Sequence, residues 1–427
     1  MKKIFLTPEN RRYLEMIGFL ILFGWISFFP QPLQERYGAL ARVFLAASLL
    51  FFITVKKYFK AILNVKDWPL WLFLVCLAAG TLSATNRAVA GNTYLYLAVT
   101  FILLFYTGKG LFYGGKIIGT VSTVICSCAI LVALAAFAEL YFKKNILYEN
   151  FLFNPYYMRY IKFNPPRPMA TQFNPVILGS YLLGCLPFSF YLLRQGSRSL
   201  RLTGLVSCLL SGAIIMLVFS RGVLLGFIAL TLFYLWNRRG VKLILLTLFC
   251  LILLVTLSSY QKNINLSRFG FSRLIAGSYD SMISPYRLER ANMTLKILKE
   301  EPFFGIGFNH FRLRFNEYYP AQDKGKVPYE FMIPDNMYLT LLAESGLIGI
   351  SGFLIFIYFL FKRAFAELKK IKDKERKQAL LVSLAALSGL LVNMAAYELF
   401  YWNNPYMLFC LFCGFIQALS LSGQRQA

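Results

Sequence analysis

The chain has 427 residues, of which 58% are hydrophobic and 17% aromatic, and its formal charge at pH 7 is +26. This composition excludes a soluble globular domain of this size and indicates a polytopic helical membrane protein, because each bilayer crossing needs roughly 20 apolar residues. Apolar runs such as 243–257 do not alternate with polar residues, which argues against a transmembrane β-barrel. The charge alone would suggest nucleic acid, but no nucleic-acid-binding motif is present and membrane topology accounts for much of it.

The apolar runs predict an all-α membrane protein with about 12 transmembrane helices. The predicted spans are residues 13–30, 38–55, 68–85, 89–107, 117–141, 175–193, 203–219, 223–237, 242–258, 338–361, 378–397 and 404–421. We interpret the first span as an uncleaved helix rather than a signal peptide. The chain therefore divides into transmembrane residues 1–258, an extramembrane insert at 259–337 and a second transmembrane part at 338–427.

Lysine and arginine are concentrated in alternate short loops, which by the positive-inside rule places both termini in the cytoplasm. The basic loops predicted inside are 56–66, 109–116, 194–201, 238–242 and 362–377. Two long loops, 141–174 and 259–337, then lie outside. Long loops do not follow the charge rule, so their basic residues favour an anionic ligand on the outer face, with an ordinary solvated surface as the alternative.

All eight cysteines lie within apolar runs, so neither a disulfide framework nor a zinc site is predicted. The CxxC spacing of Cys410 and Cys413 is typical of helix packing when it lies inside a membrane span. The chain contains no metal-ligand cluster and no nucleotide-binding motif, so we predict neither a metal nor a cofactor.

The insert contains a helix predicted to begin at Ser284-Pro285 and to end before Pro302. Its apolar and polar residues fall on different faces: Leu288, Ala291, Leu295 and Leu298 on one, and Arg287, Arg290 and Thr294 on another. Arginines at a helix N-terminus suit phosphate oxygens. The alternative is an amphipathic surface helix with solvated arginines.

Four further positions carry possible chemistry. Arg221, in Ser220-Arg221-Gly222, interrupts two apolar runs and either snorkels to the headgroups or binds an anion. Asp335 precedes a span and either caps that helix or serves as a general base for an acceptor hydroxyl. Glu344 lies deeper in the same span, where a buried acid needs a partner. His310 is the single histidine, and we interpret it as a surface residue rather than a catalytic one.

Three segments together resemble the family of O-antigen ligases and polymerases, bacterial membrane glycosyltransferases that use undecaprenyl-pyrophosphate-linked glycans. The segments are Phe219-Ser220-Arg221-Gly222, Arg287-Leu288-Glu289 through Gly305-Ile306-Gly307, and Asp335-Asn336-Met337-Tyr338-Leu339 through Gly346-Leu347-Ile348-Gly349, with Arg167-Pro168-Met169-Ala170-Thr171 and Asn174-Pro175 as weaker matches. Two positions depart from the family pattern. Ala291 stands where tryptophan is frequent, and Asp335 stands where ligases have a histidine implicated in catalysis.

The resemblance implies a GT-C-like fold in the bacterial inner membrane, with a large, partly helical periplasmic loop between helices 9 and 10. It implies an inverting, metal-independent transfer of a glycan from undecaprenyl pyrophosphate to a hydroxyl of lipid A-core on the periplasmic face. The implied catalytic residues are Arg221, Arg287 and Asp335. The implied substrate-binding residues are Arg159, Arg167, Arg290, Asn336, Tyr338, Glu344 and His310.

Two alternative functions remain open at this point. One is an O-antigen or exopolysaccharide polymerase, for which the acceptor is a lipid-linked repeat unit. The other is a non-enzymatic membrane transporter or lipid flippase. The polar residues gather at one face and in outer loops rather than along a midplane path, which disfavours transport. In each case the expected partners are membrane lipids and lipid-linked glycans, and no nucleic acid.

Overall fold

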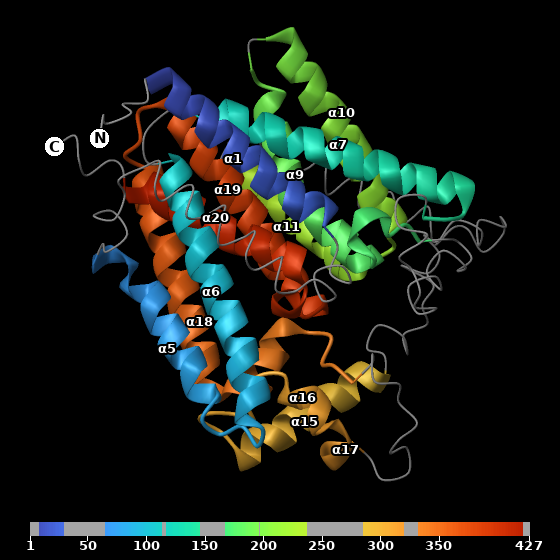
Figure 1. The fold of residues 1–427 in the computed structure, drawn as a ribbon, viewed down its shortest axis with the longest axis vertical. Helices are drawn as coiled ribbons and strands as arrows, with labels where there is room; N and C mark the ends of the chain where they lie inside the picture. The colour runs from blue at the N-terminus through green and yellow to red at the C-terminus, as the bar shows by residue number, and fades with distance from the viewer. Residues whose placement is uncertain are drawn as a thin grey trace, which may run out of the picture.

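The computed structural model describes residues 8–29, 65–112, 117–145, 167–195, 197–236, 285–319 and 332–421, and every regular element within them is a helix (Figure 1). The long helices are α1 (Pro8–Phe28), α5 (Trp68–Gly80), α6 (Arg87–Phe112), α7 (Ile118–Phe142), α9 (Pro175–Leu192), α10 (Arg198–Leu217), α11 (Arg221–Trp236), α15 (Pro285–Glu300), α18 (Met337–Leu368), α19 (Lys374–Asn393) and α20 (Asn403–Leu421). The short ones are η1 (Val65–Asp67), η3 (Ala170–Gln172), α16 (His310–Leu313), α17 (Phe315–Tyr318), η8 (Met394–Ala396) and η9 (Leu399–Tyr401).

Within the described residues, seven helices are long and apolar enough to cross a membrane: α6, α7, α9, α10, α18, α19 and α20. The chain is therefore a multi-pass membrane protein, as its composition predicts. The predicted spans 38–55 and 242–258 lie outside the described residues, so the count of twelve stays a prediction. The predicted span 68–85 is too long, because α5 has only 13 residues and ends at Gly80.

Helices α9 and α20 form the centre of the bundle, because 89% and 94% of the residues in their most apolar stretches are buried inside the protein. Helix α20 lies against α6, where glycines allow close approach. A Cβ atom at Gly414 would lie 2.1 Å from the Phe105 carbonyl oxygen, and one at Gly108 would lie 2.5 Å from the Leu411 carbonyl oxygen. Small residues at such crossings let two helix backbones meet, which is how membrane helices pack without a hydrophobic driving force between them.

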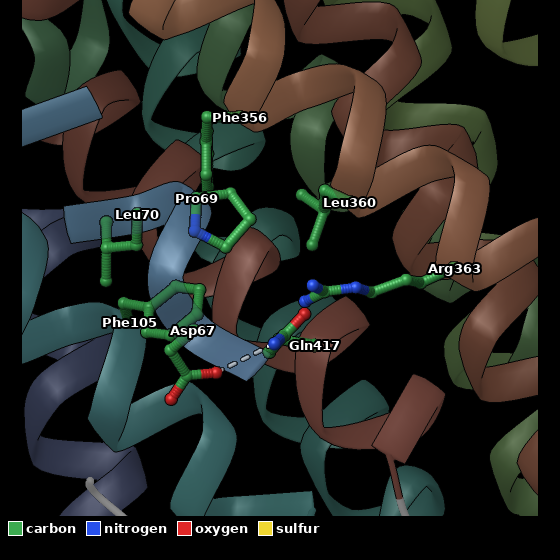
Figure 2. A pocket seen from close by; sticks show the side chains of 8 residues that line it. All are labelled: Asp67, Pro69, Leu70, Phe105, Phe356, Leu360, Arg363 and Gln417. Carbon is green, nitrogen blue, oxygen red and sulfur yellow. Dashed lines mark hydrogen bonds between the residues drawn. The ribbon is translucent and has the colours of Figure 1, made fainter. Parts of the chain in front are cut away.

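A buried ionic group occupies one end of the bundle, and Figure 2 shows its Asp67 side chain beside Gln417. The Lys109 ammonium lies 2.5 Å from Asp67, and the Gln417 side chain donates to the other oxygen of the same carboxylate at 2.7 Å. A small pocket opens beside them and is also lined by Arg363 near the C-terminal end of α18 (Figure 2). Lys109 and Arg363, which come from two loops predicted to be cytoplasmic, therefore lie at the same end of the bundle, and the side of the membrane stays a prediction.

The insert lies at the opposite end, with α15, α16 and α17 against the ends of α5, α6 and α18 (Figure 1). Helix α15 leaves most of its leucine face exposed and buries the face that carries Arg290 and Thr294. Arg290, Met293, Thr294 and Ile297 point into the protein, whereas Leu288 and Leu295 are exposed. The interpretation of α15 as a surface helix with solvated arginines is thus wrong for Arg290.

Candidate functional site

Helix α18 is interrupted at Gly346, where φ is 62° and ψ is −164°. The loop 302–307 pairs with the groups that this break releases: Ile306 N donates to the Ala343 carbonyl at 3.0 Å, and Gly307 N donates to the Glu344 carbonyl at 2.9 Å. In the other direction, Leu347 N donates to the Pro302 carbonyl at 2.9 Å. Irregular backbone at membrane depth requires such partners, because no water is there to replace them.

The glycines of two matching motifs are needed for this pairing. A Cβ atom at Gly346 would lie 2.3 Å from the Phe303 carbonyl oxygen, and one at Gly305 would lie 2.5 Å from the Ala343 carbonyl oxygen. Both glycines have positive φ, where other residues are strained. The two segments that resemble the family are therefore two halves of one joint between the insert and α18.

His310 belongs to the same joint. It is fully buried rather than at the surface, so that expectation is wrong. Its Nε2 accepts a hydrogen bond from Asn86 N at 3.0 Å, and its Nδ1 lies 2.8 Å from the Phe308 carbonyl oxygen. This pattern fits a neutral ring whose Nδ1–H donates to that carbonyl. His310 thus ties the insert to the connection between α5 and α6.

Asp335 stands just before α18 but does not cap it. The cap is Asn336, whose side-chain oxygen accepts from Tyr338 N at 2.9 Å and from Leu339 N at 3.3 Å. Asp335 has a φ of 52°, in the left-handed region. Aspartate, asparagine and histidine populate this region several-fold more often than other non-glycine residues. Asp335, which stands where the resemblance places a histidine, is therefore a residue type suited to this left-handed backbone.

Arg290 and Glu398 hold Asp335 from two sides. The Arg290 guanidinium donates to the Asp335 carboxylate, and the Asp335 backbone N–H donates to the Glu398 carboxylate. The Arg290 side chain is 6% exposed, whereas that of Asp335 is 33% exposed. Asp335 is therefore the member of the cluster that an external hydroxyl can reach, and Arg290 is engaged in positioning it.

Glu398 is the residue that sequence reasoning missed. It lies in the connection between α19 and α20 and is 2% exposed. Burial raises the pKa of its carboxyl to about 8, and the negative charge of Asp335 acts in the same direction. An acid in a short loop between two apolar helices is the signal that could have found it, but the positive-inside rule weighs only lysine and arginine.

Glu344 is buried, as its position in the span suggests. Its carboxylate accepts from Phe311 N at 3.1 Å and from the Tyr401 hydroxyl. The same hydroxyl accepts from Asn309 N at 2.9 Å. Glu344 therefore joins α18, the insert and η9 through contacts within the protein.

Arg221 begins α11 at the corner where α10 ends. Arg167 reaches the same corner, because its Nε donates to the Val218 carbonyl at 2.9 Å. The next residue, Gly222, presses on η8: a Cβ atom there would lie 2.2 Å from the Ala396 Cβ. Ala396 is two residues before Glu398 in the chain. The start of α11 and the Asp335 cluster are thus anchored on the same connection between α19 and α20.

Three further residues were predicted to belong to the site. Arg287 is exposed in the first turn of α15, one turn before Arg290. The Tyr338 hydroxyl donates to the Leu391 carbonyl at 2.7 Å and joins α18 to α19. Arg159 lies outside the described residues.

The fold and this cluster define a multi-pass helical membrane protein with a partly exposed carboxylate at one end, which is held by an arginine of a docked helical insert. The family model described as O-antigen ligase matches residues 206–354. The chain therefore carries an O-antigen ligase family domain, which confirms the resemblance drawn from its motifs. That stretch contains Arg221, Arg287, Arg290 and Asp335, and it ends before Glu398. No curated protein matches the chain.

Proposed function

We propose that the protein transfers a glycan from undecaprenyl pyrophosphate to a hydroxyl group of lipid A-core at the periplasmic face of the inner membrane. The observation that carries this proposal is the position of Asp335. Its carboxylate is one-third exposed, while its backbone and side chain are fixed by Glu398 and the buried Arg290. A proton acceptor that is both accessible and rigid is what an acceptor hydroxyl requires.

The reaction needs one proton acceptor and a stabilised leaving group. The acceptor oxygen attacks the anomeric carbon of the donor, and its proton passes to the Asp335 carboxylate. The bond between that carbon and the pyrophosphate breaks with inversion, and the pyrophosphate leaves with the electron pair. Positive groups directed at this developing charge lower the barrier most.

Arg221 and Arg287 supply that positive charge in this proposal. Arg287 is exposed in the first turn of α15, where free backbone N–H groups and the helix dipole also favour phosphate. Arg221 opens α11 beside the connection that carries Glu398. Arg167 supports the Arg221 corner through the Val218 carbonyl. Arg290 has a different role from the other two, because it fixes Asp335.

The test uses purified protein in proteoliposomes with a lipid-linked glycan donor and lipid A-core. We expect Arg221→Ala and Arg287→Ala each to lower the transfer rate by about 10²-fold or more, because removing one charge-stabilising donor has an effect of that order. Lys299→Ala is the matched control, since Lys299 is an exposed cation on the same helix as Arg287. Full activity in both arginine variants would refute the mechanism.

The acceptor is tested separately by the product. A ligase should join the glycan to lipid A-core when both substrates are present, and the reaction should stop when lipid A-core is omitted. If the glycan instead grows on lipid-linked repeats without lipid A-core, the protein is a polymerase that uses the same site. Arg221→Ala and Arg287→Ala should slow formation of whichever product the native protein makes. The variants therefore test the proposed site, and the identity of the product separately tests the proposed acceptor.

A further inference from the structure

Four large apolar side chains are exposed where the insert docks on the bundle. They are Leu82 in the connection after α5, Phe303 and Phe304 in the loop 302–307, and Leu347 just after the break in α18, with exposed fractions of 68%, 61%, 42% and 43%. We call them the docking-loop patch. Two adjacent exposed phenylalanines are unusual on a surface that meets only water.

Backbone hydrogen bonds fix this patch to the membrane helices. The Ser83 hydroxyl donates to the Gly305 carbonyl at 2.6 Å, which joins the end of α5 to the loop. Ile348 N donates to the Phe303 carbonyl at 3.1 Å, which joins the loop to α18. Phe303 and Phe304 therefore lie level with residues 347 and 348 of a spanning helix rather than on a segment that reaches out into solvent.

The patch continues two rows of exposed apolar side chains. On α18 the row is Leu347, Leu354 and Tyr358, spaced so that they share one face. On α5, which packs beside α18, it is Trp71 and Val75. Because α18 is long and apolar enough to cross the membrane, an exposed apolar row on it faces lipid. The patch lies at the end of both rows.

The length of α18 places the patch within the hydrocarbon. The chain has no charged residue between Glu344 and Lys362. The step from Leu347 to Arg363, which lines the pocket at the other end, is 363 − 347 = 16 residues, or about 24 Å at the α-helical rise. A bilayer core is about 30 Å thick. A core that begins near Arg363 therefore extends past Leu347 and past the phenylalanines paired with it.

We propose that the docking-loop patch is immersed in the hydrocarbon of the nearer leaflet, where lipid acyl chains cover Phe303 and Phe304. The loop 302–307 then acts as a membrane-embedded wedge, and the insert is seated partly in the bilayer rather than above it. The short α5 fits this arrangement, because its 13 residues span only about 20 Å and the wedge fills the remaining depth.

Site-directed spin labelling of the full chain in phospholipid vesicles tests this proposal. A nitroxide is placed at Phe303→Cys in a background whose eight native cysteines are alanine. Collisions are then measured with oxygen, which concentrates in hydrocarbon, and with a nickel chelate, which stays in water. Leu354→Cys is the lipid-facing control, and Asn316→Cys on the exposed side of α17 is the aqueous control.

We expect the label at 303 to behave like the label at 354, with a high ratio of oxygen to nickel collisions. A ratio like that at 316 would place the patch in water and overturn the proposal. Low collision with both reagents would mean that protein covers the patch, which also overturns it. If Phe303→Cys fails to fold, Leu82→Cys reports on the same patch, because Ser83 beside it is bonded to the loop.

Discussion

Replacing Gly346 with alanine should destabilise the protein strongly, because this glycine combines a forbidden backbone with a close contact. Its φ of 62° and ψ of −164° lie in a region that is essentially restricted to glycine, and other residues there cost about 1–3 kcal/mol. The added Cβ would also lie 2.3 Å from the Phe303 carbonyl oxygen, and overpacking typically adds about 1–3 kcal/mol. Together these predict a loss of roughly 2–6 kcal/mol.

Thermal unfolding in lipid nanodiscs measures this effect, and Gly212→Ala is the matched control. Gly212 lies inside α10, and a Cβ atom added there would have no neighbouring atom within 4 Å, so alanine should be neutral or stabilise by about 0.5–1 kcal/mol. Gly346→Ala should melt well below both the native chain and the control. Equal melting temperatures of Gly346→Ala and Gly212→Ala would show that α18 is not broken at Gly346. The backbone groups that pair with the loop 302–307 would then not be released.

Three further outcomes follow from the charged groups. Glu398→Gln should gain thermal stability relative to the native chain as pH rises from about 4.5 to about 8. Because the pKa of Glu398 is raised, the folded state keeps a proton that the unfolded chain has lost, and the native chain loses stability across this window. A stability difference between the two chains that does not change with pH would contradict the burial of Glu398. Asp335→Asn should abolish most transfer while Asp335→His keeps it, because histidine tolerates the left-handed backbone and can accept a proton; equal rates in the native chain and Asp335→Asn would leave Asp335 no role in proton transfer. Lys109→Met should lower stability by about 3–5 kcal/mol by leaving Asp67 buried without its cation, and adding Asp67→Asn should recover much of that loss in the same unfolding assay.

Apolar run length predicts the described membrane helices well, because a bilayer imposes the same requirement on every span. The prediction from run length fails where another segment of the same chain supplies contacts in place of a full-length span. Residues 68–85 read as one span, yet α5 stops at Gly80, since the loop 302–307 supplies contacts for the chain beyond it. The break at Gly346 is equally hidden, because its two halves read as one apolar run and only the paired loop makes the interruption stable.

Periodicity on α15 identifies two faces but cannot say which one is buried. The leucine face is the natural candidate for the core, whereas the structure buries Arg290 and Thr294 and exposes Leu288 and Leu295. The rule that apolar faces point inward comes from proteins surrounded by water. Beside a membrane, the buried residue can be an arginine that pairs with a carboxylate, as Arg290 pairs with Asp335.

The connection between α19 and α20 explains why the site extends beyond the stretch that matches the family model. Ala396 meets the start of α11 at Gly222, Glu398 receives the backbone N–H of Asp335, and Tyr401 donates to Glu344. These three contacts come from six consecutive positions, so one short segment sets the relative placement of helix α11, the Asp335 cluster and the break in α18. A motif search reads each of those elements separately, and only the fold shows that residues after 354 hold them together. Substitutions in this connection should therefore alter transfer by shifting the start of α11 or the backbone of Asp335, even though none of its residues needs to touch the substrate.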